Sequence, residues 1–460
     1  MRKYIFILYF LSASIFSIAK DYNVVLEGAV ADGKTLDTKC VQACIDRANA
    51  DGGGSVIIPA GKSVTVGTLY LKSNVTLTVE NGATLLASPD IKDYTLDTHK
   101  NMYKNEPHMD RAFLFAREAE NIHINGGGKI DGNGYFKNFK KNTGRPMMIR
   151  MMHCSNIRIN DIKLYNPAAW TSAFLYCDRI TVSGIEIVSR VNNNGDGLDF
   201  DGCTNVRVSD SYFDTSDDSI CLQASDPAYP CKYVTVTNCN FTSKWAGIRI
   251  GLLSRGDFES VAVNNCTFHD IKDAGLKIQM NEGGKMRHMT FSNLVMKNVP
   301  RPIFMTFAQQ KACVDAPEEM YSMNKMESFT FQNFIVDNTE LDENSAIFIT
   351  GMPGHDIGQI ILKDFQLYFK GGGSAELKDK VVKEYTLETL AGWWPEFHLV
   401  GTLPASGVYA RHIEGLYMEN IHLNIETPDA RQPFIFNDVK NYAVDRCYWN
   451  KKPVDFPLSQ

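Results

Sequence analysis

The sequence NVRVSDSYF, residues 205–213, alternates apolar and polar side chains on both sides of a Ser-Asp-Ser step. The same phrase returns as YVTVTNCNF at Tyr233 and as SVAVNNCTF at Ser260. Alternation with a period of two is typical of a β-strand with one buried face. Further copies begin at Asn74, Asn121, Asn156, Arg179, His288, Phe329, Ile360 and Gly415. A short two-strand unit therefore repeats along most of the chain.

The central copies follow one another every 23 to 28 residues, a period typical of solenoid proteins. Strands this short cannot enclose a core alone, so neighbouring coils must stack, each about 4.8 Å above the last. No helix-length amphipathic pattern separates the copies, which excludes a TIM barrel and a doubly wound sheet. We predict an all-β fold, a single-stranded right-handed parallel β-helix. A β-propeller is the alternative, but its blades need roughly 40 to 45 residues.

One helix is expected, over residues 36–49, where LDTKCVQACIDRAN precedes Asp51 and three glycines. At the N-terminal end of a solenoid, such a helix would cover the open end of the coil stack. The length of 460 residues would ordinarily suggest two or three domains. The repeat instead predicts that residues 20–460 form one β-helix domain.

The N-terminus has the features of a secretory signal peptide over residues 1–19. Arg2 and Lys3 precede an apolar run over residues 4–16, and Ser17, Ile18 and Ala19 follow as small or apolar residues before a cleavage site. The run is shorter than the roughly 20 residues of a membrane-spanning helix, and no second long apolar stretch exists. We therefore expect an exported protein, periplasmic or extracellular, with no membrane span. A buried N-terminal helix is the alternative.

The composition excludes several classes of protein. With 44% hydrophobic residues, 22% charged residues and a net charge of -6, the chain is not disordered. A nucleic-acid-binding protein usually has a basic excess, so we expect no such partner. The eleven cysteines mostly lie beside alternating runs, which favours buried thiols over disulfides. Pairing of Cys40 with Cys44, or of Cys221 with Cys231, remains the alternative.

Aligning four coils on their inward residues brings polar side chains into columns. Leu198, Ile220, Ile248 and Leu276 set the register, with spacings of 22, 28 and 28 residues. The columns then read Asp196, Asp218, Ala246 and Ala274; Asp199, Cys221, Arg249 and Lys277; and Asp201, Gln223, Gly251 and Gln279. The alignment places Asp196 and Asp218 one coil apart, and Asp217 directly precedes Asp218.

These three aspartates are the candidate catalytic residues. Clustered carboxylates repel one another, so one of them should have a raised pKa. Glycoside hydrolysis needs this asymmetry, a protonated acid for the leaving oxygen and an ionised base for water. Gly195 and Gly197 are expected to let the chain bend and turn Asp196 outward. A Ca²⁺ site is the alternative for such a cluster, since Ca²⁺ also binds several carboxylates.

The chain resembles glycoside hydrolase family 28, the pectin-cleaving polygalacturonase family, and in particular its bacterial members. The resemblance covers nearly the whole mature chain. It rests on IDGNG at Ile130, RPMMIR at Arg145, NPAAW at Asn166, RPIF at Arg301 and LPASGVYARHIEGL at Leu403. The family's Asn-Thr-Asp element appears as Asn194-Gly195-Asp196 and its paired aspartates as Asp217-Asp218.

The resemblance implies a pectin-lyase-like β-helix and an inverting mechanism. Asp217 would be the general acid, and Asp196 and Asp218 would activate the water. Asn194, Asp199, Arg249, Lys277, Gln279 and Trp245 are the candidate substrate-binding residues. No cofactor and no metal are expected, and the ten histidines show no metal-ligand spacing.

The chain departs from the family pattern in two elements. The family's Gly-His-Gly element is here Trp245-Ala246-Gly247, so Ala246 replaces the histidine. Its Arg-Ile-Lys element, which binds the substrate carboxylate, is here Lys277-Ile278-Gln279. Arg249 and Lys277, on adjacent coils beside Asp199, are expected to take over this role, or else Arg249 forms an ordinary ion pair with Asp199.

We expect an exported glycosidase that cleaves α-glycosidic bonds of an acidic plant polysaccharide, such as pectin, galacturonan or rhamnogalacturonan. The changed residues and the long segments 93–111 and 378–406, placed to block one end of a groove, favour exo action of the α-galacturonidase kind. One alternative is a polysaccharide lyase that uses Ca²⁺ and a basic residue, Arg249 or Lys277. Another is a carbohydrate-binding β-helix without catalysis.

Overall fold

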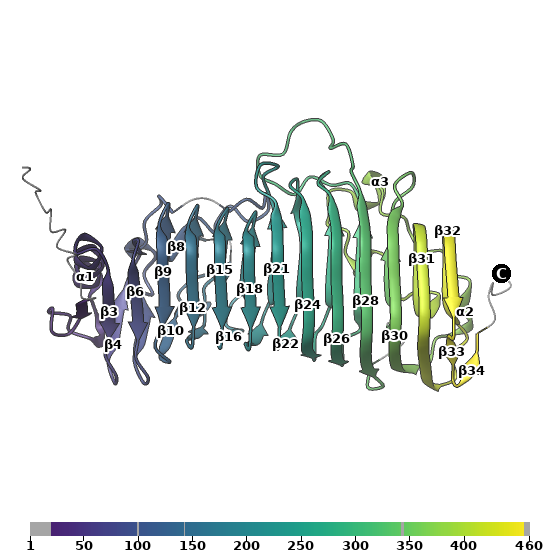
Figure 1. Ribbon diagram of the computed structural model, residues 1–460, viewed down its shortest axis with the longest axis horizontal. Coiled ribbons are helices and arrows are strands. Elements are labelled where there is room, and N and C mark those ends of the chain that lie inside the picture. Colours follow the sequence, from purple (N-terminus) through teal and green to yellow (C-terminus); the bar gives the residue numbers. More distant parts are fainter. Residues whose placement is uncertain (1–19, 99–100, 142, 342–344, 455–460) are drawn as a thin grey trace, which may run out of the picture.

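The computed structural model describes residues 20–98, 101–141, 143–341 and 345–454. The predicted signal peptide, residues 1–19, lies outside the described residues. Parallel strands follow one another in a single elongated ladder, a right-handed parallel β-helix (Figure 1). The predicted fold class is confirmed.

Three parallel sheets run along the helix and form the walls of each coil. The first sheet contains β1 (Lys20–Asn23), β3 (Gly54–Ile58), β6 (Val75–Val79), β9 (Glu120–Asn125), β12 (Ser155–Asn160), β15 (Asp178–Ser183), β18 (Thr204–Ser209) and β21 (Cys231–Thr237). The second contains β2 (Asp32–Leu36), β4 (Ser63–Val66), β7 (Thr84–Ala87), β10 (Lys129–Asp131), β13 (Lys163–Tyr165), β16 (Glu186–Ser189), β19 (Tyr212–Thr215) and β22 (Asn240–Ser243). Each strand pairs with its counterpart one coil away.

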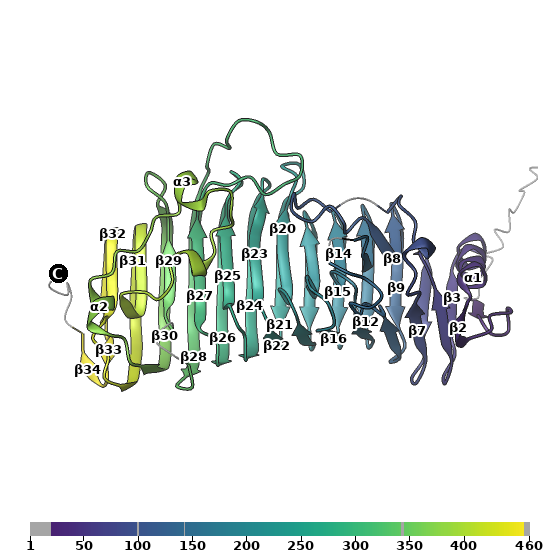
Figure 2. The same ribbon diagram turned by 180° about the vertical axis from the view of Figure 1, so that it is seen from behind.

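The third sheet faces the viewer in Figure 2. It contains β5 (Leu69–Tyr70), β8 (Arg111–Arg117), β11 (Pro146–Met152), β14 (Ser172–Leu175), β17 (Leu198–Asp201), β20 (Ile220–Ala224), β23 (Ala246–Ser254), β25 (Ala274–Met280), β27 (Arg301–Phe307) and β29 (Ile347–Thr350). Its outer face carries the predicted acidic columns.

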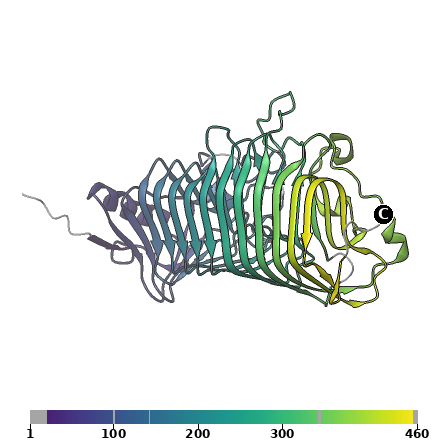
Figure 3. The same ribbon diagram turned by 45° about the vertical axis from the view of Figure 1, so that its right-hand side comes forward.

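Toward the C-terminus the strands lengthen and pass through the corners between sheets. β24 (Phe258–His269), β26 (Met286–Lys297), β28 (Met326–Asn338) and β30 (Ile357–Gly371) join the first and second sheets. β31 (Ala405–Thr427) pairs in all three sheets, β32 (Gln432–Asp445) pairs in the third and first, and β33 (Tyr448–Trp449) forms an antiparallel hairpin with β34 (Lys452–Pro453). Figure 3 shows these last coils from the C-terminal side.

The corner between the first two sheets explains the polar step inside each repeat. The corner residue adopts a left-handed backbone, with φ of 53° at Asp210, 56° at Asn238 and 53° at Asn265. Asn and Asp tolerate this conformation better than other non-glycine residues. The side chains also bond between coils, since Asn238 donates to Asp210 at 3.1 Å. The repeat therefore marks turns as well as strands.

The core is a set of stacks, because equivalent inward residues lie directly above one another. Phe241 stacks between Phe213 and Phe268, with ring centroids 5.0 and 4.9 Å apart, and all three rings are buried. Ten of the eleven cysteines are buried and all are free, so neither alternative disulfide is present. The thiols act as small core side chains.

The helix α1 (Thr38–Ala50) lies at the N-terminal end of the coils and buries Val41, Cys44, Ile45 and Ala48 (Figure 1). This confirms the capping helix, shifted by one or two residues from its predicted bounds. A long connection before β31 carries α2 (Ala375–Lys378), α3 (Leu387–Leu390) and a 3-10 turn (Phe397–Leu399), and a shorter 3-10 turn lies at Ile91–Asp93. Within the described ranges, none of the helices has the length and apolar character to cross a membrane.

The predicted register is confirmed at its anchor residues. Leu198 pairs with Ile220, Ile220 with Ile248, and Ile248 with Leu276. The column Asp199, Cys221, Arg249 and Lys277 follows from the same pairings.

One predicted pairing, Gln223 with Gly251, is wrong. Leu222 pairs with Ile250, but Ala224 pairs with Ser254, so β23 bulges between Ile250 and Ser254.

Candidate functional site

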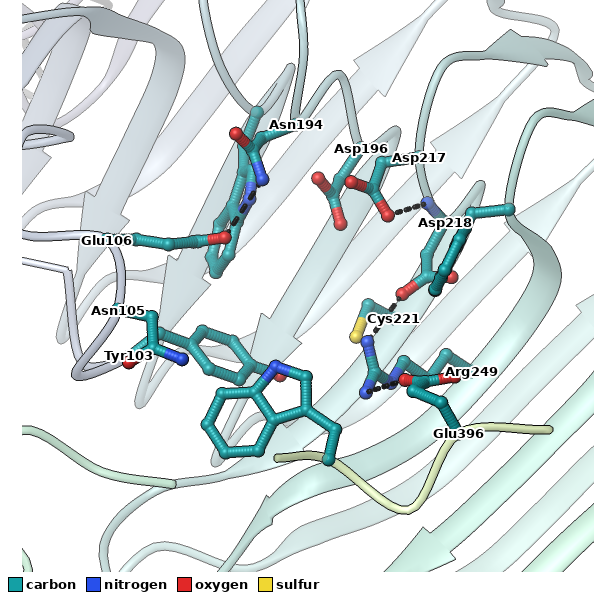
Figure 4. A pocket seen from close by; sticks show the side chains of 13 residues that line it. Tyr103, Asn105, Glu106, Asn194, Asp196, Asp217, Asp218, Cys221, Arg249 and Glu396 are labelled. Carbon is teal, nitrogen blue, oxygen red and sulfur yellow. Dashed lines mark hydrogen bonds and ion pairs between the residues drawn. The ribbon is translucent and has the colours of Figure 1, made fainter. Parts of the chain in front are cut away.

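A cavity of about 200 Å³ opens on the outer face of the third sheet, over β17, β20 and β23 (Figure 4). Its lining combines predicted site residues with side chains from the long connections. The lining residues are Tyr103, Asn105, Glu106, Trp170, Asn194, Asp196, Asp217, Asp218, Cys221, Trp245, Arg249, Trp394 and Glu396.

The three predicted catalytic aspartates meet in this cavity. Asp196 precedes β17, and Asp217 and Asp218 precede β20 on the next coil. A carboxylate oxygen from each lies within 4.8 Å of the others. The Asp218 amide donates to Asp217 Oδ1 at 3.1 Å, and the Asp218 carboxylate lies toward Arg249 (Figure 4). The coil register, inferred from sequence, is what brings them together.

The glycines on either side of Asp196 serve close packing. Neither has a positive φ, so the left-handed freedom of glycine is not used here, although the chain does bend at Gly197 and Asp196 faces the cavity as predicted. A Cβ atom at Gly197 would lie 2.2 Å from the Ser219 carbonyl oxygen, and one at Gly195 would lie 2.5 Å from that of Ser189. Any side chain there would push the Asp196 segment away from the coil beneath it.

Burial and mutual repulsion raise the pKa values of these acids. Burial, followed by the charges of Asp218 and Glu106, raises the pKa of Asp217 to about 8. Burial and the other aspartates also raise the pKa of Asp196 well above its usual value. Burial raises the pKa of Glu106 to about 7. Asp217 is therefore a carboxylic acid that stays protonated at neutral pH.

Arg249 is the cation of the cavity, and its main partner differs from the predicted one. It donates to Asp218 Oδ2 at 3.1 Å and to Gln279 Oε1 at 3.0 Å. Asp199 instead accepts a hydrogen bond from Gln223 Nε2 at 3.1 Å. The alternative ion pair of Arg249 with Asp199 is therefore not formed, because the guanidinium reaches past Asp199 to Asp218, which directly precedes β20.

Lys277, Gln279 and Asp199 lie beneath the cavity and do not line it. Lys277 is fully buried; it donates to Asp273 at 2.8 Å and forms a second ion pair with Glu396. Burial opposes its charge, but the two carboxylates raise the pKa of Lys277 above its usual value. Its amine also lies 4.6 Å from the centre of the Trp245 ring.

Asn194 is held in place by residues that sequence reasoning did not assign to the site. Arg145 donates to Asn194 Oδ1 at 2.8 Å and to the carbonyl oxygens of Asn193 and Ala168 at 2.7 and 3.1 Å. Asn194 Nδ2 in turn donates to Glu106 Oε1 at 2.9 Å. Arg145 belongs to a noted motif, RPMMIR, but its spacing gave no sign that it would reach across two coils.

Both long segments singled out in the sequence contribute walls to the cavity. Segment 93–111 supplies Tyr103 and Glu106, and segment 378–406 supplies Trp394 and Glu396. The rings of Tyr103 and Trp394 meet edge to face at 6.4 Å. The two segments therefore touch each other over the site.

A third connection, between β27 and β28, reinforces this wall; it rises above the coils in Figure 2. The Lys104 amide donates to the Ala312 carbonyl oxygen at 3.1 Å, and the Val314 amide donates to that of Met102 at 2.7 Å. Gln310 donates to the Trp393 carbonyl oxygen at 2.7 Å. Three connections thus form one continuous barrier at one side of the aspartates.

Among the residues that the structure describes, two carboxylate-rich clusters have atoms close enough to bind a metal ion. One is the aspartate triad itself, and the other is Asp356, His412 and Asp438 near the C-terminal end. Arg249 already holds Asp218, and His412 already meets Asp438 at 2.6 Å and Glu384 at 3.2 Å. Ca²⁺ takes six to eight oxygen ligands, so either cluster would need further oxygens, such as those of water, to complete a site.

A family model described as "Glycosyl hydrolases family 28" matches residues 53–375. A probable polygalacturonase of Vitis vinifera is 27% identical, and the alignment covers 61% of this chain. It also covers only 61% of the relative's own length. An exo-poly-alpha-D-galacturonosidase of Dickeya chrysanthemi is 27% identical over 76% of this chain and 68% of its own.

Solved structures share the fold. The family 28 exopolygalacturonase of Yersinia enterocolitica aligns with a TM-score of 0.68 and 22% identity over 95% of this chain and 79% of its own. An exopolygalacturonase from Thermotoga maritima aligns with a TM-score of 0.64 and 20% identity over 80% of this chain and 89% of its own.

Proposed function

Because the chain belongs to glycosyl hydrolases family 28, we propose that it is an exported, exo-acting, inverting enzyme that removes sugars from one end of a pectic polysaccharide. The observation that carries the proposal is the aspartate triad. It combines a carboxyl whose pKa is raised to about 8, Asp217, with a buried oxygen, Asp196 Oδ1, that accepts no hydrogen bond within the described protein. Asp217 would supply the acid that glycoside hydrolysis needs, and Asp196 Oδ1 is an open acceptor for the attacking water.

In the proposed mechanism, Asp217 donates its proton to the glycosidic oxygen as the bond to the anomeric carbon breaks. Asp196 and Asp218 bind a water molecule, and one of them accepts its proton as the water oxygen attacks the anomeric carbon. Arg249 fixes Asp218 through the 3.1 Å hydrogen bond. Positive charge that develops on the sugar ring is stabilised by the surrounding carboxylates.

The predicted binding residues divide into two groups in this proposal. Asn194, Arg249 and Trp245 line the cavity and are placed to contact the sugar. Asp199, Lys277 and Gln279 support them from beneath, Gln279 through its 3.0 Å contact with Arg249. The Trp245 ring offers an apolar face of the kind on which the C–H groups of a sugar pack.

Exo action is supported by the barrier that the three connections build. An endo-acting enzyme needs a groove open at both ends, so that a chain can pass through it. Here Tyr103 and Trp394 close over one side of the triad, and Tyr103 also packs against Trp170 at 5.7 Å. A chain end would enter the cavity and stop at this wall.

The proposed inversion of configuration is supported by the family resemblance. The separation of the carboxylates supports it less directly. The carboxylates approach within 4.8 Å, whereas inverting enzymes with two carboxylates usually hold them roughly 6.5–9.5 Å apart. With three aspartates, the water sits between two of them and the acid is the third, so the two-carboxylate rule does not apply unchanged.

The test is a time course with pectic oligosaccharides labelled at the reducing end. Wild-type protein should release one small product from one end from the first turnovers, and Asp217→Asn should release almost none. Early products of intermediate length would contradict exo action. The N-terminal sequence of the exported protein should begin near residue 20.

The second candidate, a lyase, is favoured only by the ability of the triad to gather three carboxylates around a cation. A lyase product is unsaturated and absorbs ultraviolet light, and its formation would stop in a chelator. A hydrolase gives no such absorbance and keeps its activity in the chelator.

A further inference from the structure

The cations that the sequence offers for a substrate carboxylate, Arg249 and Lys277, are already paired with carboxylates of the protein. Arg249 holds Asp218, and Lys277 holds both Asp273 and Glu396. Arg301, on the next coil, holds the other oxygen of Asp273 at 3.1 Å. Three cations and three carboxylates therefore form one buried, balanced network.

Glu396 lies where a substrate carboxylate would meet these cations. It comes from the connection before β31, and only 4% of it is exposed. Its two oxygens point to different partners, one to Lys277 and the other to Arg249 at 3.9 Å (Figure 4). A free sugar carboxylate at this place would have to displace Glu396 or lie against it, at a cost in charge repulsion.

The remaining lining makes the cavity still less suited to an acidic ring. Five carboxyl groups and a single guanidinium line it. Two of these carboxyl groups, those of Asp218 and Glu396, already lie against Arg249, at 3.1 and 3.9 Å. A ring without a free carboxylate fits this lining, because its hydroxyls can donate to the carboxyl groups.

A second groove, of about 420 Å³, begins on the other side of Trp245, which lines both spaces. Its lining includes Lys244 and Lys272, both exposed, together with Arg301 and Phe397. The one carboxylate in the lining, Asp273, is already paired with Lys277 and Arg301. Within the described chain, neither lysine amine is held in an ion pair. This groove has the uncommitted positive charge that the cavity lacks.

We propose that the enzyme binds a polysaccharide in which acidic sugars alternate with sugars that lack a free carboxylate. A sugar without a free carboxylate binds in the aspartate cavity, and a uronic acid binds in the adjoining lysine groove. Glu396 is the residue that sets this specificity. The inference rests on the proposed function for the substrate class, and it names the charge that each subsite accepts.

The experiment measures binding to the Asp217→Asn protein by titration calorimetry, so that turnover does not interfere. Three probes of equal length are compared: an unesterified oligogalacturonide, its full methyl ester, and a rhamnogalacturonan fragment in which neutral and acidic sugars alternate. We expect the alternating probe to bind at least tenfold more tightly than the unesterified one and about tenfold more tightly than the ester.

Two sets of variants on the same background assign the effect. Glu396→Gln should improve binding of the unesterified probe about tenfold, while Glu388→Gln, the same change at an exposed position of the same connection, should not. Replacing Lys244 and Lys272 by Ala should weaken binding of the alternating probe about tenfold and leave the ester unchanged. These two lysines are exposed, so this variant tests the inference even where Glu396→Gln fails to fold.

Equal or tighter binding of the unesterified probe to the Asp217→Asn protein would overturn the inference. An ester that binds as tightly as the alternating probe would overturn the role of the lysine groove. Hydrolysis assays with wild-type protein separate the two proposals. If no probe is hydrolysed but the binding order holds, the proposed function fails alone; if probes are hydrolysed and the order is reversed, this inference fails alone.

Discussion

Replacing Asp217 by Asn tests the most specific feature of the site, a carboxyl kept protonated by its surroundings. Asn keeps the Oδ1 acceptor that the Asp218 amide uses at 3.1 Å, so the turn should be preserved. It has no acidic proton to give the leaving group. General acid catalysis typically contributes 10²–10⁴-fold, so kcat should fall by about that factor. This corresponds to roughly 3–5 kcal/mol of activation free energy.

The same change should stabilise the fold, with a characteristic pH dependence. Asp217 has a pKa of about 8 in the folded state, against about 3.9 in an unfolded chain. Below pH 4 both states are protonated and the group has no effect. As pH rises toward 8, the unfolded state loses the proton first, so the wild-type fold loses stability. The upper limit of this loss is about 6 kcal/mol.

Urea unfolding of wild type and Asp217→Asn at a series of pH values from 4 to 9 measures this. The free energy difference between them should be small at pH 4, grow up to about pH 8 and then level off. Asp161→Asn is the matched control, an exposed turn residue whose left-handed backbone accepts Asn. A difference that does not change with pH, or a variant that retains wild-type kcat, would refute the assignment of Asp217.

Three further predictions concern the surroundings of the site. Glu106→Gln removes a charge that raises the pKa of Asp217, so the alkaline limb of the pH–rate profile should move to lower pH. Glu282→Ala leaves three backbone amides without their acceptor, and two of them, at 2.7 and 3.0 Å, belong to residues 312 and 313. The change should lower the free energy of unfolding by about 2–4 kcal/mol and raise KM. Phe241→Ala opens the aromatic stack and should cost about 3–5 kcal/mol in urea unfolding without a specific loss of kcat.

Each of these has its own contradicting result. If the alkaline limb of the pH–rate profile does not move in Glu106→Gln, the charge of Glu106 does not set the pKa of the catalytic acid. Glu282→Gln keeps an acceptor oxygen, so an equal loss in this variant and in Glu282→Ala would mean that the loop amides are not the cause. A loss below 1 kcal/mol in Phe241→Ala would mean that the stack contributes less than its burial suggests.

The coil register was predictable because it depends on local alternation alone. Leu198, Ile220, Ile248 and Leu276 each occupy the same place in their repeat, and parallel pairing carries that place from coil to coil. Asp196, Asp217 and Asp218 keep fixed offsets from these anchors. Their meeting in one cavity therefore followed from spacing.

The partners of the cations were not predictable in the same way. Glu396 and Glu106 come from connections that have no repeat, so nothing in their spacing shows which coil they cover. Glu396 lies 119 residues from Lys277 along the chain. The pairing of Arg249 with Asp218 was missed because a long side chain can reach either of two carboxylates, and the column places only its backbone.

The configuration of the released sugar tests the proposed roles of the three aspartates most directly. Proton NMR of the wild-type reaction with an α-linked pectic oligosaccharide shows the anomeric signal of the product before it equilibrates. The β-anomer should appear first, since water attacks the face opposite the leaving group. An α-anomer, or an unsaturated product, would contradict the proposed reaction.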